Sequence, residues 1–455
     1  MKTFQKQSLA ILFAVLGTFY FSGTTAQTVS KSETEQQMLK KADENIEKFR
    51  KGNAEIQFKD KDGRPIQNVK VELVQKSHDF LFGCIIFDLV NDKNTYQPEL
   101  FKERFKKLFN LAVFPFYWSA YENQQGKPQW TKMTSTLEWC KLNGITTKGH
   151  PLVWACHSGA PKWLKDYDAD AATDLLKARV INTVAGFKGQ INLWDVVNEP
   201  VNVRSWNNKL KNFDSENDWD VQDSISEIAD YVEKSLRWAH SANPEATLLI
   251  NEYNSIPKVS VRSRYARLLK ELQKRNAPLS GIGIQAHEPR EAWFSPEDLW
   301  KTYDLYYGMG FPIHITELMP QSSGKEITGG WRVGKWTEEA QAEFADQFFR
   351  LSFGHPGVVS INWWGMSERN IWLEGGGLID KEYNPKPVYK ALDKLINETW
   401  KTNMTSQTWK EGKIQFNGFF GNYDIELVTS DGKVHVFQFH VGKDETNSKV
   451  FTVTD

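Results

Sequence analysis

Short apolar runs alternate with stretches of helical periodicity between residues 80 and 399. The helical stretches, in which apolar residues recur every three or four positions, include residues 98–108, 131–143, 169–184, 225–242, 261–276 and 337–353. The short runs are typical of buried strands and span residues 81–87, 111–116, 145–150, 192–198, 247–251, 281–285, 313–316 and 358–364. Eight strands alternating with helices predict an α/β protein built as a (β/α)8 TIM barrel.

A doubly wound open sheet is the competing fold, because it has the same alternation of strands and helices. No G-x-G-x-x-G pattern follows the first strand, however, and polar residues stand at the end of nearly every predicted strand. In a barrel all eight carboxyl ends face one mouth, where catalytic side chains gather. The polar strand ends therefore favour the barrel.

Both ends of the chain have a different pattern. Residues 27–79 predict a lead-in helix over residues 33–52, followed by a small β appendage with a hairpin turn at residues 61–65. Residues 386–398 predict the closing helix of the barrel. In residues 400–455, apolar and polar positions alternate over residues 413–419, 423–429, 433–441 and 449–454. We therefore expect a small C-terminal all-β domain.

The first 26 residues have the layout of a secretory signal peptide. Lys2 and Lys6 precede an apolar run over residues 8–21, and small residues follow up to Ala26, the expected cleavage point. The run is shorter than the roughly 20 apolar residues that a membrane span requires. We therefore expect a secreted or periplasmic protein without a membrane span in the mature chain.

The composition further narrows the range of possible functions. The chain has 56 basic and 57 acidic residues, a balance that gives no electrostatic reason to expect nucleic acid as a partner. Its 18 tryptophans suit either core packing or stacking on sugar rings. The three cysteines, Cys84, Cys140 and Cys156, allow at most one disulfide, and we expect buried free thiols. The histidines lack metal-ligand spacing, so neither a metal nor a cofactor is expected.

Two glutamates stand at the ends of predicted strands. Glu199 ends INLWDVVNE, at the fourth strand, and Glu317 ends FPIHITE, at the seventh. Strands four and seven lie across a barrel mouth from each other, and retaining hydrolysis of a glycosidic bond needs two carboxyl groups about 5 to 5.5 Å apart. We assign Glu199 as acid/base, Glu317 as nucleophile and Asn198 as a hydrogen-bonding partner of a sugar hydroxyl. A lone Asn-Glu would be better explained as a salt-bridged strand end, and it is the pair of glutamates on these two strands that favours catalysis.

These motifs resemble those of a known family. WDVVNE at 194–199 and HITEL at 314–318 are similar to the acid/base and nucleophile motifs of glycoside hydrolase family 10, the endo-β-1,4-xylanases. The resemblance extends over about residues 80–395, through GHPLVW at 149–154, NEYN at 251–254, GIGIQAH at 281–287, WWG at 363–365 and NPKP at 384–387. It implies a pocket for the reacting sugar lined by His150, Trp154, Asn198, Gln285, His287, Trp364 and Trp372.

Other positions in these motifs fit more than one role. Gln285 and His287 can bind the nucleophile and a sugar hydroxyl, or be buried polar residues satisfied by the backbone. Trp364 can form an apolar wall of the pocket or plug the barrel. Asn251 and Tyr253 fit equally a supporting role beneath the pocket and a plain place in the core.

The chain also departs from the family pattern. Family members have Glu-Asn-x-Met-Lys-Trp after strand two, where this chain has VFPFYW at 113–118. Phe114 and Tyr117 thus stand where an amide and an ammonium grip sugar hydroxyls on the nonreducing side, and we expect that subsite to prefer stacking or to be partly blocked. His157 is displaced by two residues and either reaches back to the pocket or lies on the surface. Met319 replaces an aspartate, which removes a charged partner of His287.

These observations lead to two functional hypotheses. The first is a secreted, retaining endo-glycoside hydrolase that acts on a β-linked polysaccharide, with β-1,4-xylan or a related decorated polymer as substrate. The second is a glycan-binding protein whose barrel has lost efficient catalysis; the retained glutamates speak against it and the departures speak for it. The oligomeric state is not indicated by the sequence.

Overall fold

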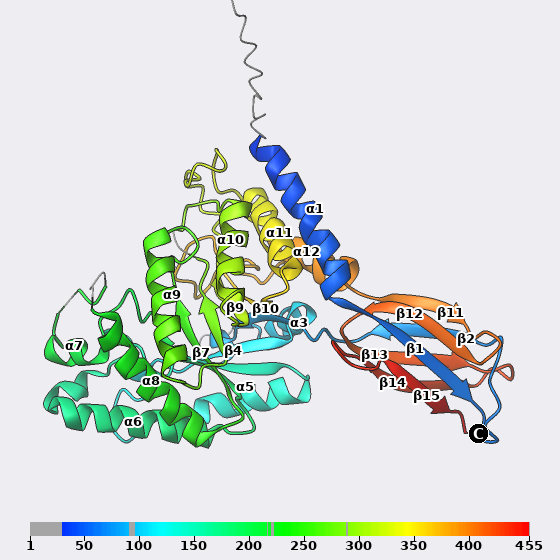
Figure 1. The fold of residues 1–455 in the computed structure, drawn as a ribbon, viewed down its shortest axis with the longest axis horizontal. Helices are drawn as coiled ribbons and strands as arrows, with labels where there is room; N and C mark the ends of the chain where they lie inside the picture. Colours follow the sequence, from blue (N-terminus) through cyan, green and yellow to red (C-terminus); the bar gives the residue numbers. More distant parts are fainter. Residues whose placement is uncertain (1–29, 91–95, 216, 220–222, 288–289, 455) are drawn as a thin grey trace, which may run out of the picture.

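The computed structural model describes residues 30–90, 96–215, 217–219, 223–287 and 290–454. The predicted signal peptide, residues 1–26, lies outside the described residues. Figure 1 shows two bodies joined side by side, a large α/β unit and a smaller unit made of strands. None of the described helices is both long enough and apolar enough to cross a bilayer.

The large unit is a closed barrel of parallel strands, as predicted. Its order around the ring is β10-β3-β4-β5-β6-β7-β8-β9, so the chain goes once around and closes between its last and first barrel strands. The strands are β3 (Leu81–Ile85), β4 (Leu111–Pro115), β5 (Thr146–His150), β6 (Leu193–Asn198), β7 (Thr247–Glu252), β8 (Gly281–Ile284), β9 (Ile313–Leu318) and β10 (Val358–Trp363). This arrangement confirms the (β/α)8 barrel.

Helices connect the barrel strands and cover them (Figure 1). The main ones are α3 (Pro98–Leu108), α5 (Thr131–Leu142), α6 (Ala169–Gly186), α8 (Ile225–Ala242), α9 (Val259–Lys274), α10 (Pro296–Tyr307), α11 (Glu338–Gly354) and α12 (Pro387–Lys394), which η3 (Leu395–Thr399) extends. Shorter ones are α2 (Phe87–Val90), α4 (Trp118–Tyr121), η2 (Lys162–Asp166) and α7 (Trp206–Lys211). Local sequence sets their ends: α8 begins at a capping box, in which Ser224 and Glu227 each bond the other's backbone N–H.

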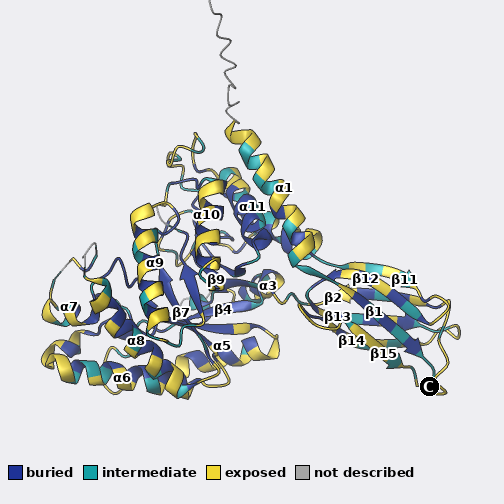
Figure 2. Ribbon diagram, viewed as in Figure 1, coloured by how far each residue is buried: buried dark blue, intermediate teal, exposed yellow. Residues whose placement is uncertain are grey.

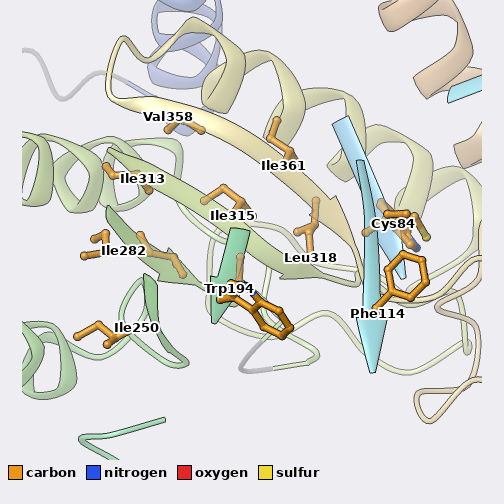
Figure 3. Packing of buried hydrophobic residues seen from close by; sticks show 14 of the residues in the cluster. Cys84, Phe114, Trp194, Ile250, Ile282, Ile313, Ile315, Leu318, Val358 and Ile361 are labelled. Atoms are coloured by element: carbon orange, nitrogen blue, oxygen red, sulfur yellow. The ribbon is translucent and has the colours of Figure 1, made fainter. Parts of the chain in front are cut away.

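The main core lies between the barrel and its helices. Figure 2 shows buried strands at the centre, surrounded by helices whose outer faces are exposed. Strand residues such as Ile282, Ile313 and Ile361 belong to one continuous buried cluster with residues of the helices (Figure 3). Phe114 belongs to the same cluster and is fully buried.

The smaller unit is a pair of sheets to which both ends of the chain contribute. One sheet has the order β12-β1-β15 and the other β11-β2-β13-β14. Their strands are β1 (Lys51–Lys59), β2 (Lys70–Gln75), β11 (Asn403–Gln407), β12 (Lys413–Phe419), β13 (Gly421–Val428), β14 (Val434–Val441) and β15 (Ser448–Thr452). The inner faces share one apolar core, which includes Ile56, Leu73, Ile414 and Ile425.

The expected N-terminal hairpin forms only at its turn, where Lys59 and Pro65 make an antiparallel bridge. A tight turn does form at residues 60–64, but β1 pairs with β12 and β15, whereas β2 pairs with β11 and β13. The physical reason is that apolar faces of both strands need partners, and the C-terminal strands supply them on two separate sheets. The N-terminal appendage and the C-terminal β segment are therefore parts of one unit.

The lead-in helix α1 (Lys31–Phe49) joins the two units. It packs against α11, and it leads directly into β1 (Figure 1). At the junction, the Arg50 guanidinium donates from Nε to the carbonyl of Phe353 (2.6 Å) and from Nη2 to those of His355 (2.6 Å) and Val358 (2.7 Å). These bonds tie the start of the smaller unit to the barrel.

Candidate active site

A cleft of about 730 Å³ opens at the carboxyl ends of the barrel strands. All nine residues predicted for the site line it, although they come from five different strand ends. The lining residues are Ile85, Phe87, Tyr117, His150, Trp154, Ser158, Asn198, Glu199, Trp219, Tyr253, Gln285, His287, Arg290, Glu317, Trp364, Asn370, Ile371 and Trp372. The closed barrel brings them together, because its parallel strands all end at the same rim.

Glu199 is held in a constrained position just after β6. Its backbone has a φ of 56°, in the left-handed region that a glutamate rarely adopts, and its N–H donates to the carbonyl of Asn251 (2.7 Å). Trp154 Nε1 donates to one carboxyl oxygen (3.1 Å) and Gln285 Nε2 to the other (2.9 Å). Residues at the ends of β5 and β8 thus orient the carboxyl group, and the end of β7 holds the backbone.

The environment of Glu199 favours its protonated form. Burial, together with the nearby Glu317 carboxylate, raises its pKa to about 7 against the lowering effect of the Gln285 hydrogen bond. The carboxyl group is therefore able to hold a proton near neutral pH, as a general acid must.

Glu317, near the end of β9, is surrounded by donors. Asn251 Nδ2 donates to Oε1 (2.7 Å), and His287 Nε2 lies 3.2 Å from Oε2. Asn251 also donates to Asn198 Oδ1 (2.9 Å) and accepts a bond from Thr316 Oγ1 (2.6 Å). Of the two roles considered for Asn251, the contacts therefore favour support of the site over a plain place in the core.

A buried ionic chain reaches Glu317 from inside the barrel, and the sequence analysis missed it. Asp195 Oδ2 lies 2.8 Å from Lys148 Nζ and 2.8 Å from His150 Nδ1, and all three side chains are about 1% exposed. Burial alone would raise the pKa of Asp195, but Lys148 and then His150 lower it below its ordinary value. The ionised Asp195 accepts a hydrogen bond from the Nδ1–H of His150, and His150 Nε2 lies 3.8 Å from Glu317 Oε1. A lysine within a buried strand was the available signal for this chain.

Aromatic rings form much of the remaining wall. Trp364, just after β10, packs edge-on against the His150 ring with centroids 4.9 Å apart. Trp372 is 48% exposed and lies between the His287 ring (5.3 Å) and the Arg290 guanidinium (4.4 Å). Trp364 thus forms a wall of the cleft and does not merely fill the end of the barrel. Trp219 and Arg290 also line it, and neither was picked out from the sequence.

The departures from the family pattern have three different outcomes. Tyr117 does line the cleft, but Phe114 is fully buried in the core (Figure 3), so its expected place in a sugar subsite is wrong. Successive strand residues face opposite ways, and this alternation turns Phe114 away from the mouth. His157 lies on the surface, with a 65% exposed side chain 3.6 Å from Asp218. Met319 is buried against Trp364 and takes no part in the polar network.

Cysteines and metal ligands are other groups that could take part in chemistry. Cys84, Cys140 and Cys156 are buried free thiols, as expected. Within the described parts of the chain, no three or more His, Cys, Asp or Glu side chains are grouped so that they could hold a metal ion. The carboxyl groups of Glu199 and Glu317 both line the cleft.

Comparison with known proteins identifies the family. Residues 72–395 match the model of Glycosyl hydrolase family 10. The endo-1,4-beta-xylanase B of Thermotoga neapolitana is 28% identical over 318 residues, which cover 67% of this chain and 85% of that protein. The endo-1,4-beta-xylanase 1 of Arabidopsis thaliana is 25% identical over 425 residues, 91% of this chain but only 40% of that protein.

Solved structures agree on the fold. Xylanase 10B of Thermotoga petrophila RKU-1, determined with xylobiose, superposes with a TM-score of 0.57 at 23% identity, covering 70% of this chain and 95% of that one. Native xylanase 10B of Thermotoga maritima gives a TM-score of 0.58 at 23% identity, with 70% and 96% coverage. With the family match over most of the barrel, these findings show that the chain belongs to glycosyl hydrolase family 10 and is a glycoside hydrolase.

Proposed function

We propose that this protein is a retaining endo-glycoside hydrolase that cleaves β-1,4-xylan or a related decorated polymer. The observation that carries the proposal is the pair of carboxyl groups in one cleft, Glu199 with a pKa of about 7 and Glu317 held by Asn251 and His287. The choice of xylan draws on the names of the relatives, several of which are endo-1,4-beta-xylanases.

The reaction divides into two steps. In the first, Glu317 attacks the anomeric carbon while Glu199 gives its proton to the leaving oxygen, so that the glycosidic bond breaks and a glycosyl ester forms. In the second, Glu199 removes a proton from water, and the hydroxide attacks the anomeric carbon and releases Glu317. Esterified Glu317 carries no charge, which removes one cause of the raised pKa of Glu199 and suits its change from acid to base.

The other cleft residues have roles in this scheme. Asn251 and His287 hold the Glu317 carboxylate by donating to its two oxygens. Gln285 and Trp154 orient the Glu199 carboxyl group. We assign His150, Asn198, Trp364 and Trp372, together with these residues, to binding of the reacting sugar; the family resemblance and their position in the cleft support the assignment.

We also propose that the protein is secreted or periplasmic. The signal-peptide layout of residues 1–26 supports this location. If it is correct, N-terminal sequencing of the protein recovered outside the cytoplasm will begin at Gln27. A mature chain that retains Met1 would contradict it.

Hydrolysis of a panel of xylans, mixed-linkage glucans and galactans tests the function. We expect the wild-type protein to cut xylan with retention of anomeric configuration, as followed by NMR, and Glu317→Ala to be inactive. Glu199→Ala should lose activity on xylan but still form the glycosyl ester from an aryl xyloside with an acidic leaving group, which needs no protonation.

Two results would reject the proposal. One is the absence of any cleaved glycan, and the other is equal cleavage by wild type and Glu317→Ala. Tight xylan binding without turnover, even of aryl xylosides, would instead support a glycan-binding protein on a xylanase-like barrel.

A further inference from the structure

One wall of the cleft is apolar. It consists of Ile85 at the end of β3, Phe87 in α2, Tyr117 after β4, and Trp364 and Ile371 after β10; we call these five residues the apolar patch. The Phe87 ring contacts two others, since its centroid lies 5.8 Å from that of Trp364 and 6.2 Å from that of Tyr117. The patch comes from three strands that are adjacent in the barrel, β10, β3 and β4.

Polar side chains gather on the other side of the cleft. Asn198, Glu199, Gln285 and His287, which follow or end β6 and β8, present carboxyl, amide and imidazole groups to the cleft. Glu199 protonates the leaving group in the proposed reaction, so the leaving part of the substrate lies toward β6 and β7. Three strands lie between β3 and β7 around the ring in either direction, so β3 is diametrically opposite β7, and we therefore place the patch on the nonreducing side of the scissile bond.

The patch has few hydrogen-bonding groups. Its only polar side-chain atoms are the Tyr117 hydroxyl and the Trp364 indole N–H, both of which donate, and only the hydroxyl also accepts. Burial, with the Glu317 and Glu199 carboxylates, raises the pKa of Tyr117 well above its ordinary value, so the phenol keeps its proton. The neighbouring Asn370 donates its amide to Asp88 (3.0 Å).

A sugar that carries free hydroxyl groups suits this wall poorly. Each hydroxyl has a proton to donate, and a buried donor left without an acceptor is unfavourable. An ester needs no acceptor, because its carbonyl oxygen only accepts and its alkyl end has no polar atom. One or two donors set among aliphatic and aromatic side chains therefore match an ester better than a hydroxyl.

We propose that the apolar patch binds an O-acyl ester substituent, such as an acetyl group, on the sugar at the nonreducing side of the scissile bond. The inference rests on the proposed function and names a class of substrate for it, a xylan that carries ester groups. Tyr117 or Trp364 donates to the ester carbonyl, and the acyl methyl group packs on Ile85, Phe87 and Ile371.

The test compares partially acetylated xylo-oligosaccharides with the same oligosaccharides after mild alkaline deacetylation. We expect wild type to have a kcat/KM at least about fourfold higher for the acetylated form, the factor that burial of one methyl group supplies. Ile371→Ser should bring this ratio close to one. Tyr117→Phe should lower it by about two- to tenfold if the hydroxyl holds the carbonyl.

Tyr253→Phe is the matched control, because it removes a phenolic hydroxyl from the other side of the same cleft. We expect it to leave the ratio between the two substrates unchanged. A wild-type ratio at or below one would overturn the inference while leaving the proposed function intact, because both substrates are then cut. A ratio that Ile371→Ser does not change would place the acyl group elsewhere and also overturn it.

Failure of the proposed function gives a different result, namely no cleavage of either oligosaccharide or of an aryl xyloside. The patch is then tested by calorimetric binding of the same two oligosaccharides. Tighter binding of the acetylated form by wild type, lost in Ile371→Ser, supports the inference, and equal binding overturns it.

Discussion

Replacement of Glu199 by glutamine should make the protein more stable at neutral pH. Burial and the nearby Glu317 carboxylate raise the Glu199 pKa from its ordinary 4.5 to about 7. A change of this size corresponds to roughly 3 kcal/mol of unfavourable free energy for the ionised form in the folded protein. The side chain is only 8% exposed, so solvent screening reduces this figure little.

The sign of the pH dependence follows from proton binding. Below pH 4.5 the carboxyl group is protonated in both the folded and unfolded chains, and its burial carries no charge penalty. Between pH 4.5 and about 7 the folded state binds more protons than the unfolded state, so the free energy of unfolding falls as the pH rises. Above that range the full penalty of roughly 3 kcal/mol is present, and a glutamine, which cannot ionise, avoids it.

Urea unfolding followed by tryptophan fluorescence measures the effect. We expect wild type and Glu199→Gln to differ by roughly 3 kcal/mol more at pH 8 than at pH 4.5, in favour of the variant. Glu138→Gln, which replaces an exposed glutamate of α5, is the matched control and should show no such pH dependence. A stability difference between wild type and Glu199→Gln that is the same at both pH values would refute the reasoning.

Four further outcomes are expected. The kcat/KM of wild type on xylan should fall above about pH 7, where Glu199 loses its proton, and a pH–rate profile checks this. Gln285→Ala removes the 2.9 Å bond that lowers this pKa, so the alkaline limb of the same profile should move to higher pH. Asp195→Asn leaves the buried Lys148 unpaired and should lower the free energy of unfolding by about 3–5 kcal/mol in urea, with partial recovery on adding Lys148→Met. Arg50→Met removes three bonds to carbonyl groups and should destabilise the protein by about 3 kcal/mol or more in the same assay.

The barrel and its central pair of glutamates were accessible from the sequence because both depend on local pattern. A buried strand requires a short apolar run, and the residue after it lies at the rim, so Glu199 and Glu317 could be placed at one mouth without coordinates. The pairing of strands from the two ends of the chain was not predictable in the same way. Gly52 pairs with Gly418, and no local signal records a contact between residues so far apart in the chain.

The orientation of single side chains was also beyond the sequence. Phe114 was expected in the cleft and is in the core, because a shift of one residue along a strand turns a side chain to the other face. The contacts of Asp195 with Lys148 and His150 join two neighbouring strands, and their effect on the Asp195 pKa depends on burial that the linear pattern does not reveal.

For this protein the sequence by itself determined the order of strands and helices, the closed α/β fold and the identity of the two carboxyl groups. Only the tertiary structure decided that Glu199 holds a proton near neutral pH, that Asn251 and the Lys148–Asp195–His150 chain support Glu317, and that one wall of the cleft is apolar. The physical reason is that periodicity and motifs are properties of neighbouring residues, whereas desolvation, charge–charge interaction and the shape of a cleft arise between residues that only the closed barrel brings together.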